Sequence, residues 1–180
     1  MPERRVLKDA YTQADSVVLL SQGVPFMQEG EEFMRSKKKA DGTYEGNSYN
    51  CGDLINNMDY SLKVENLDVF NKIKEAIAFR KANAAFSLNS QSDINGAISS
   101  LTQSGGNITY KISYQGRNYY IIHAIKAASI SLGSSYTLAY ASSDRAIGDT
   151  MSSVSVKANE TLVFSKWVGK EELKPLFLKV

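Results

Sequence analysis

The chain has 180 residues, with 21 basic and 19 acidic side chains and a net charge of +2, so its charge gives no reason to expect a nucleic-acid or membrane partner. The hydrophobic share of 43% is ordinary for a globular protein, and this length suits one domain, or one small domain plus part of another. No apolar run approaches the roughly 18 residues of a membrane span. Cys51 is the only cysteine, which excludes an intrachain disulfide and permits a reducing compartment without proving one.

The first expected elements are a helix and a short strand. Apolar residues recur at helical spacing over residues 4–20, and Gln22-Gly23 then breaks the pattern. These apolar positions are Val6, Leu7, Ala10, Ala14, Val17 and Val18. The apolar run at residues 24–27 favours a strand buried on both faces, as in a parallel barrel, although Pro25 has no N–H to donate and suits only a strand end.

A polar loop and a second helix follow. Residues 41–50 are polar and contain glycine, which indicates a long loop. Asn66 is the expected N-cap of the helix, with Asp68 in its first turn, and Arg80 and Lys81 stand where cations are favoured at a helix C-terminus. The apolar stripe of this helix is Val69, Phe70, Ile73, Ala76 and Ile77. Helix, strand, loop and helix are the parts of a repeating βα fold.

The pattern changes to short strands after Asn83. Residues 107–115 alternate apolar and polar, and Gln115-Gly116 is a tight-turn signal before a second strand over residues 117–126, which predicts a β-hairpin. Further strands are expected at residues 136–141, 154–157 and 160–166. These favour an antiparallel sandwich, so we expect two domains, residues 1–85 and residues 86–180.

Two groups of motifs carry a family resemblance. Gly23, Pro25, Gly30 and Glu32 match the Gly-x-Pro-x-x-x-x-Gly-x-Glu pattern of the eighth barrel strand in the α-amylase superfamily. The stretches Glu31-Glu32-Phe33, Arg35-Ser36-Lys37, Ser48-Tyr49-Asn50 and residues 53–60 resemble the loop that follows this strand in type I pullulanases, its α-1,6-debranching members. The resemblance covers roughly residues 5–88. Tyr60 stands where Trp is commoner, and Cys51 where a small hydroxyl residue is usual.

The resemblance implies an α+β fragment: the last βα unit of a (β/α)8 TIM barrel, followed by an antiparallel all-β sandwich. It implies a parent glycoside hydrolase that cleaves α-1,6 branch links in pullulan, amylopectin or glycogen by a retaining mechanism. In this family the three catalytic carboxylates lie on earlier strands, so no catalytic residue is expected in this chain. The implied partners are an α-glucan and the missing N-terminal part of the barrel; no cofactor and no metal site is expected.

The resemblance also indicates which side chains contact substrate. Arg35, Asn50, Asp53 and Asn56 offer the donors and acceptors that sugar hydroxyls need, and Tyr49 offers a flat face. The competing interpretation is a loop that only braces itself with turn-forming Asx residues. Gly23, Pro25, Gly30 and Glu32 are expected to be structural residues near this site.

One catalytic assignment is excluded at this stage, and one alternative function remains open. The acids Glu29, Glu31 and Glu32 could be taken for a catalytic pair, but without a partner from another strand they cannot flank a glycosidic bond. The chain could instead be a non-catalytic carbohydrate-binding or assembly module. His123, the only histidine, is expected to be solvent-facing or hydrogen-bonded in the core, because no second histidine or cysteine completes a transition-metal site.

Overall fold

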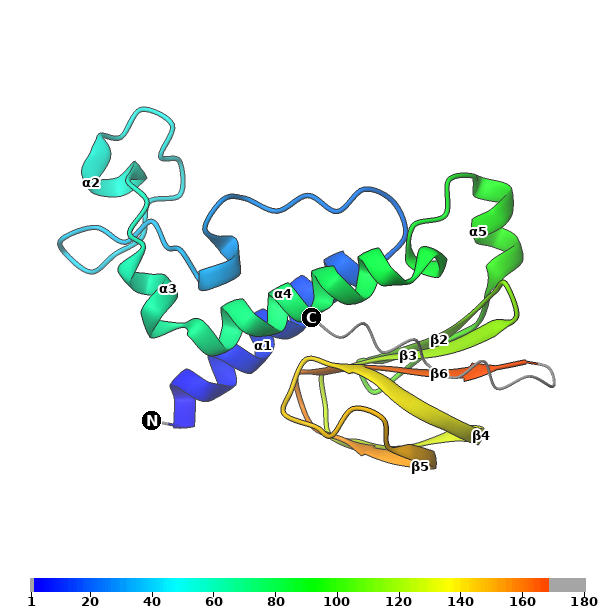
Figure 1. Cartoon of the computed structure of the whole chain (residues 1–180). Helices are drawn as coiled ribbons and strands as arrows, with labels where there is room; N and C mark the ends of the chain where they lie inside the picture. Colours follow the sequence, from blue (N-terminus) through cyan, green and yellow to red (C-terminus); the bar gives the residue numbers. More distant parts are fainter. Residues whose placement is uncertain (1, 169–180) are drawn as a thin grey trace, which may run out of the picture.

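A computed structural model describes residues 2–168 of the chain (Figure 1). Two long helices, α1 (Pro2–Leu20) and α4 (Leu67–Ala82), lie side by side above an antiparallel sheet. The short helical elements are η1 (Glu31–Phe33), α2 (Asp53–Asn56), α3 (Ser61–Glu65), η2 (Ala84–Phe86) and α5 (Gln91–Ala97). The strands are β1 (Ile98–Ser104), β2 (Asn107–Tyr114), β3 (Arg117–Ala124), β4 (Ala128–Ala141), β5 (Thr150–Val156) and β6 (Glu160–Trp167).

The two predicted helices are confirmed, but Asn66 acts differently from expectation. It occupies the N-cap position of α4, yet its side chain makes no capping bond there. Its amide donates instead to the carbonyl of Phe33, at 3.1 Å, and so ties α4 to η1.

The strand predicted at residues 24–27 is not formed by the described residues. This segment runs extended without a ladder partner, and Val24 and Phe26 are 95% and 87% exposed. A parallel strand needs hydrogen-bonded neighbours, and among residues 2–168 all the pairings are antiparallel: those within the β1–β6 sheet and one isolated bridge between Lys38 and Tyr44. The described residues therefore do not form a barrel βα unit.

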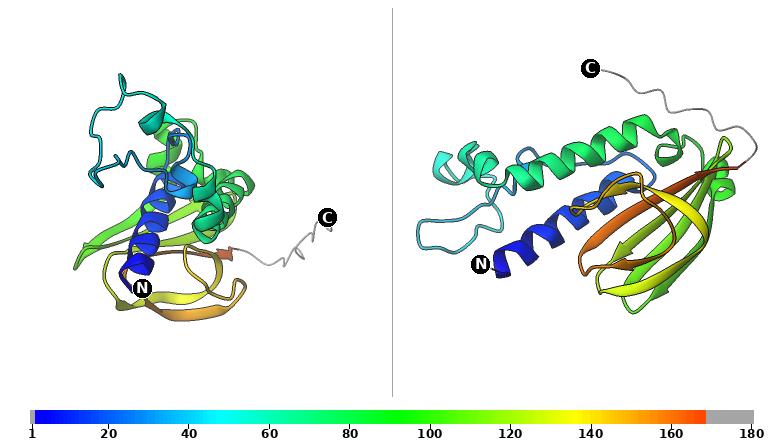
Figure 2. Two further views of the ribbon diagram at one scale, coloured as in Figure 1. Left: turned by 90° about the vertical axis from the view of Figure 1, so that its left-hand side faces the viewer. Right: turned by 60° about the horizontal axis from the view of Figure 1, so that its bottom comes forward.

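The six strands form one sheet in the order β1-β2-β3-β6-β4-β5. The β2–β3 hairpin is confirmed, and its turn residues Gln115 and Gly116 both have positive φ, at 48° and 75°, as a type I′ turn requires. Figure 2 shows how the sheet curls so that its two halves face each other, which gives a sandwich-like body from one continuous ladder. Element α5, strand β1 and the first half of β4 were not predicted.

The curled sheet has two apolar cores, one on each face. The inner core lies between the two halves of the sheet and draws only on strands and their connections. The outer core joins the sheet to the helices: Tyr119, Ile121 and Val163 pack in one cluster with Leu20 of α1 and Ile73 of α4. Neighbouring residues on β3 and β6 alternate between the two cores, as strand geometry dictates.

Helix α1 buries an unexpected face. Its buried side toward the sheet and α4 is largely polar and consists of Thr12, Gln13, Asp15, Ser16, Leu19 and Leu20. Four of its predicted apolar positions are 37–59% exposed: Val6, Leu7, Val17 and Val18. The amphipathic pattern of α1 thus predicts the helix correctly, while its main apolar stripe is left uncovered by the described residues.

Candidate functional site

The predicted site residues all belong to the segment that connects α1 to α4 along the chain. This segment loops out beyond the two helices (Figure 1). The segment starts at Gly23, whose φ of 92° lets the chain leave α1. Arg80 of α4 secures this exit, because its guanidinium donates to the carbonyls of Leu19, Ser21 and Gly23 at 2.6–2.7 Å. Half-buried Pro25 follows in the extended segment. Arg80 thus satisfies carbonyls that a helix C-terminus leaves unpaired.

The turn of residues 28–35 is held by its own side chains. Glu32 accepts from the backbone N–H of Gly30 at 3.0 Å, and Arg35 N–H donates to the Gly30 carbonyl at 2.9 Å. Gly30 has φ 89°, and a Cβ there would lie 2.7 Å from Arg35 Cδ and 2.8 Å from Met58 Sδ. Only glycine suits this backbone and this space.

Arg35 and Asn56 serve as braces within the loop. An Nη atom of Arg35 donates to the Asn56 carbonyl. The Asn56 amide donates to the carbonyls of Ser48 and Cys51 at 2.7 and 2.6 Å, and its Oδ1 accepts from Lys37 Nζ at 2.8 Å. The polar atoms of Asn56 are therefore already engaged by the chain itself.

Tyr49, Asn50 and Asp53 are placed differently. All three are exposed, Tyr49 by 84%, and Asp53 opens the short helix α2. Among the described residues their side chains make no hydrogen bond. The structure thus divides the predicted substrate residues into two braces and three outward-facing groups.

An acidic cluster that sequence reasoning missed lies beside this turn. Asp15 of α1 is 5% exposed, and Glu31 and Glu32 of η1 are its charged neighbours. Burial, followed by the charges of the two glutamates, raises the pKa of Asp15 to about 7. The available signal was the i, i+4 spacing of Tyr11, Asp15 and Leu19, which puts Asp15 on a side of α1 that also carries apolar residues.

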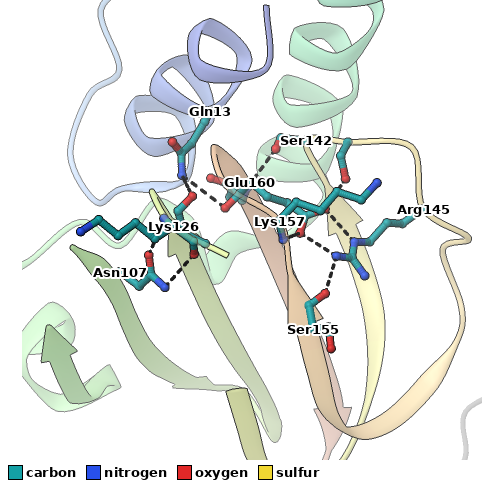
Figure 3. A network of polar contacts seen from close by, with 11 residues as sticks. Gln13, Asn107, Lys126, Ser142, Arg145, Ser155, Lys157 and Glu160 are labelled. Atoms are coloured by element: carbon teal, nitrogen blue, oxygen red, sulfur yellow. Dashed lines mark hydrogen bonds and ion pairs between the residues drawn. The ribbon is translucent and has the colours of Figure 1, made fainter. Parts of the chain in front are cut away.

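A second polar cluster centres on Glu160, at the start of β6 (Figure 3). This side chain is 1% exposed and accepts from Arg145 at 2.6 and 2.7 Å, from Lys157 N–H at 2.8 Å and from Ser143. Burial opposes ionisation, but these hydrogen bonds outweigh it and hold the pKa of Glu160 below its usual range. Gln13 of α1 donates to the Glu160 carbonyl at 3.3 Å. The hydrogen-bonding groups of Glu160 are therefore paired, and this network has a structural role: it holds α1 and the loop after β4 to the start of β6.

His123 is a hydrogen-bonded core residue, which is one of the two placements expected for it. It is 6% exposed, its Nδ1 lies 2.9 Å from Thr161 Oγ1, and burial lowers its pKa to about 4. Across residues 2–168, no set of three or more His, Cys, Asp or Glu side chains is placed to hold a metal ion. No helix in the same range is both long and apolar enough to cross a membrane.

Two surface hollows lie away from the outward-facing residues. A polar cleft of about 890 Å³ lies between α1, α4 and the loops at residues 142–144 and 157–160. An apolar groove of about 470 Å³ lies between residues 27–32 and α4, lined by Phe70, Ile73 and Ile77. Neither hollow includes Tyr49, Asn50 or Asp53.

The sequence of this chain is similar to parts of two pullulanases. The chain is 35% identical over 99 residues to a pullulanase of Bacillus subtilis, which is 55% of this chain and 13% of that protein. It is 41% identical over 56 residues to the chloroplastic pullulanase 1 of Arabidopsis thaliana, which is 31% of this chain and 5% of that protein. The chain is similar to the C-terminal region of pullulanases. No family model matches the sequence.

Solved structures of a pullulanase and of a glycogen-degrading protein share the fold. The pullulanase of Bacillus acidopullulyticus superposes with a TM-score of 0.75 at 27% identity, over 88% of this chain and 20% of that one. The catalytic module of the pneumococcal glycogen-degrading virulence factor SpuA superposes with a TM-score of 0.78 at 20% identity, over 95% of this chain and 33% of that one. The chain therefore spans a third or less of each of these four proteins.

Proposed function

We propose that this chain is the C-terminal part of a pullulanase-like hydrolase that cleaves α-1,6 links of pullulan, amylopectin or glycogen with retention of configuration. Under this proposal the catalytic carboxylates come from barrel strands outside this sequence, and none of its own acids is catalytic. The observation that carries the proposal is the 35% identity to the Bacillus subtilis pullulanase over more than half of the chain. Related pullulanases complexed with maltose, maltotriose and maltotetraose support an α-glucan as ligand.

The proposed protein partner is the N-terminal part of the barrel. Two uncovered features support it: the exposed apolar stripe of α1, and the extended segment with Val24 and Phe26 in solvent. Exposed apolar surface of this kind marks an interaction site. Parallel strands on both sides of residues 24–27 would satisfy the unpaired backbone and bury both side chains.

The proposed glucan contacts come from the outward-facing residues. Asp53 and Asn50 offer acceptors and donors for sugar hydroxyls, and Tyr49 offers a ring face for stacking. Arg35 and Asn56 hold the loop in the conformation that presents them, through their bonds to backbone carbonyls. A rigid support of this kind limits the ordering cost of binding.

A chimeric enzyme tests the proposal. The chain replaces the corresponding region of the Bacillus subtilis pullulanase, and reducing-sugar release from pullulan is measured for the chimera and for the chain alone. We expect activity from the chimera and none from the chain. In the chimera, Asp53→Ala should lower kcat/KM roughly ten- to a hundredfold, because one charge-assisted hydrogen bond is worth about 1.5–3 kcal/mol. Leu54→Ala, at a fully exposed neighbouring position, is the control and should change nothing.

Two outcomes would contradict this assignment. Hydrolysis by the purified chain that disappears on mutating Glu31 or Glu32 would place catalysis within the sequence. Retardation of the chain in a pullulan gel, combined with an inactive chimera, would favour a carbohydrate-binding module instead.

A further inference from the structure

One carboxyl oxygen of Asp15 is buried without a donor to stabilise its charge. Asp15 is 5% exposed, and its Oδ2 is buried with no hydrogen-bond partner among the described residues. An ionised carboxylate in such a place loses its hydration and gains nothing in return, so it favours the protonated form.

The groups that face Asp15 from η1 and from its own helix are acidic or phenolic. Glu31 and Glu32 are the charges that act on it, and both disfavour a further negative charge. Tyr11, one turn earlier on α1, donates its hydroxyl to the Glu31 carbonyl at 2.8 Å. The contact between α1 and η1 therefore combines one favourable hydrogen bond with three carboxyl groups.

The other elements packed on α1 supply no compensating cation. Helix α4 contributes buried Val69, Ile73 and Ala76, the acid Glu75, whose charge acts on Tyr140 as that of Asp15 does, and the guanidinium of Arg80, which is engaged by three carbonyls at the end of α1. Strand β4 contributes Tyr140, whose hydroxyl lies 2.7 Å from Ser16 Oγ, and strand β6 contributes Glu160, whose carbonyl accepts from Gln13. Because the guanidinium of Arg80 is already engaged by these carbonyls, protonation is the means of neutralising Asp15 that this packing offers.

We propose that Asp15 is a proton-operated latch between α1 and the turn of residues 28–35. When its carboxyl is protonated, the turn stays docked on α1; when it is ionised, repulsion from Glu31 and Glu32 moves the turn away from α1, while the hydrogen bond from Asn66 to Phe33 keeps η1 on α4. The turn carries Glu32 and Arg35, so release loosens the braces of the loop with Tyr49, Asn50 and Asp53. The latch itself needs no ligand, and only its effect on glucan binding rests on the proposed function.

The direction and size of the effect follow from linkage. The carboxyl has a pKa of about 7 in the closed form and about 3.9 when solvated. The stability of the closed form is greatest below about pH 3.9 and falls as pH rises toward 7, because the open form releases its proton first. Between pH 6 and pH 8 the opening equilibrium should increase about tenfold.

Hydrogen exchange of the 180-residue chain tests the latch. After correction for intrinsic exchange rates, amides of residues 28–35 should lose about tenfold in protection between pH 6 and pH 8. Asp15→Asn keeps the shape and removes the titration, so its protection should not change over this range. Asp9→Asn, an equivalent change on α1 away from η1, should behave as the unmodified chain does.

Carbon-13 NMR of the Asp15 carboxyl gives a second readout that needs no variant. We expect a titration midpoint near pH 7. A midpoint below pH 5 would overturn the proposal, as would Asp15→Asn protein whose residues 28–35 lose protection with pH to the same extent as the unmodified chain. Because neither measurement involves a glucan, their outcome does not depend on the chimera's activity.

Discussion

At the scale of single residues, the ion pair of Glu160 and Arg145 is a structural contact with a buried carboxylate. Its carboxylate is almost fully buried and is held by a bidentate guanidinium and a backbone N–H. Such a pair stabilises only when its hydrogen bonds are complete, and removal of one partner leaves a buried charge unpaired. The pair fastens the loop after β4 to the turn that leads into β6.

Arg145→Ala should therefore destabilise the fold by about 1.5–3 kcal/mol, the value of hydrogen bonds to a charged group. Urea unfolding at pH 7 measures it. Lys157→Ala is the matched control, because Lys157 reaches Glu160 through its backbone N–H alone and should change stability by less than about 0.5 kcal/mol. Equal unfolding midpoints for both variants would show that the pair contributes nothing.

The same pair predicts a pH dependence of opposite direction to that of Asp15. The pKa of Glu160 is lower in the folded protein than in the unfolded chain. Its stabilisation is therefore present above about pH 4.3 and is lost as pH falls through the folded value. Unfolding midpoints measured from pH 6 down to pH 3 should fall less steeply for Arg145→Ala than for the unmodified chain. A parallel fall in both would contradict this origin.

The structural roles that could be predicted from the sequence are those of residues whose contacts lie within a few positions along the chain. Gly30 and Glu32 make contacts within a few positions, so their pattern already indicated a structural turn. Asp15 and Arg80 depend on elements that lie 16 or more residues away along the chain, and no local pattern specifies which side of a helix those elements cover. The division of the five substrate candidates into braces and exposed groups depends on contacts between distant residues for the same reason.

At the scale of elements, local periodicity predicted what it could determine. Both long helices and the β2–β3 hairpin follow from spacing and turn chemistry. Strand β1 was not predicted because its residues do not alternate between apolar and polar, and six of its seven positions are exposed. The strand expected at residues 24–27 does not form, because a strand needs hydrogen-bonded neighbours that the described residues do not supply.

Substitutions on helix α1 can test which of its faces packs against the rest of this chain. Leu20 is fully buried, while Val18 is 43% exposed. Leu20→Ala should cost about 2–5 kcal/mol by opening a cavity in the outer core, and Val18→Ala should stay within about 0.5 kcal/mol. Thermal or urea unfolding of the chain measures both, and a large cost at Val18 would mean that self-association already covers this face.

The same substitution should behave differently in the chimera. If the barrel covers the apolar stripe of α1, Val18→Ala there removes buried methyl groups and should destabilise the enzyme by about 0.5–1.5 kcal/mol or more. An unchanged melting temperature of the chimera would argue against barrel packing at this position and would leave the proposed partner without this support.

At the scale of the whole molecule, the two cores differ in the elements that form them. The inner core consists of residues from the sheet and its connections, such as Ile122, Leu138 and Phe164, and closes without the helices. The outer core needs both layers, because Leu20 and Ile73 pack against Tyr119 and Val163. We therefore propose that residues from about 88 onward form the autonomous unit and that the helical layer depends on docking against it.

Amide hydrogen exchange on the whole chain should reveal this hierarchy. The strands that line the inner core should open only with global unfolding, since their hydrogen bonds lie between two buried faces. Residues 24–60 should exchange fastest, because they have few backbone bonds and many exposed side chains. Helices α1 and α4 should fall between, with opening free energies below that of β3 and β6. Uniform strong protection from Val17 to Ile77 in a monomer, equal to that from Tyr110 to Ile125, would instead show that the helical layer is as stable as the sheet and that the chain unfolds as one unit.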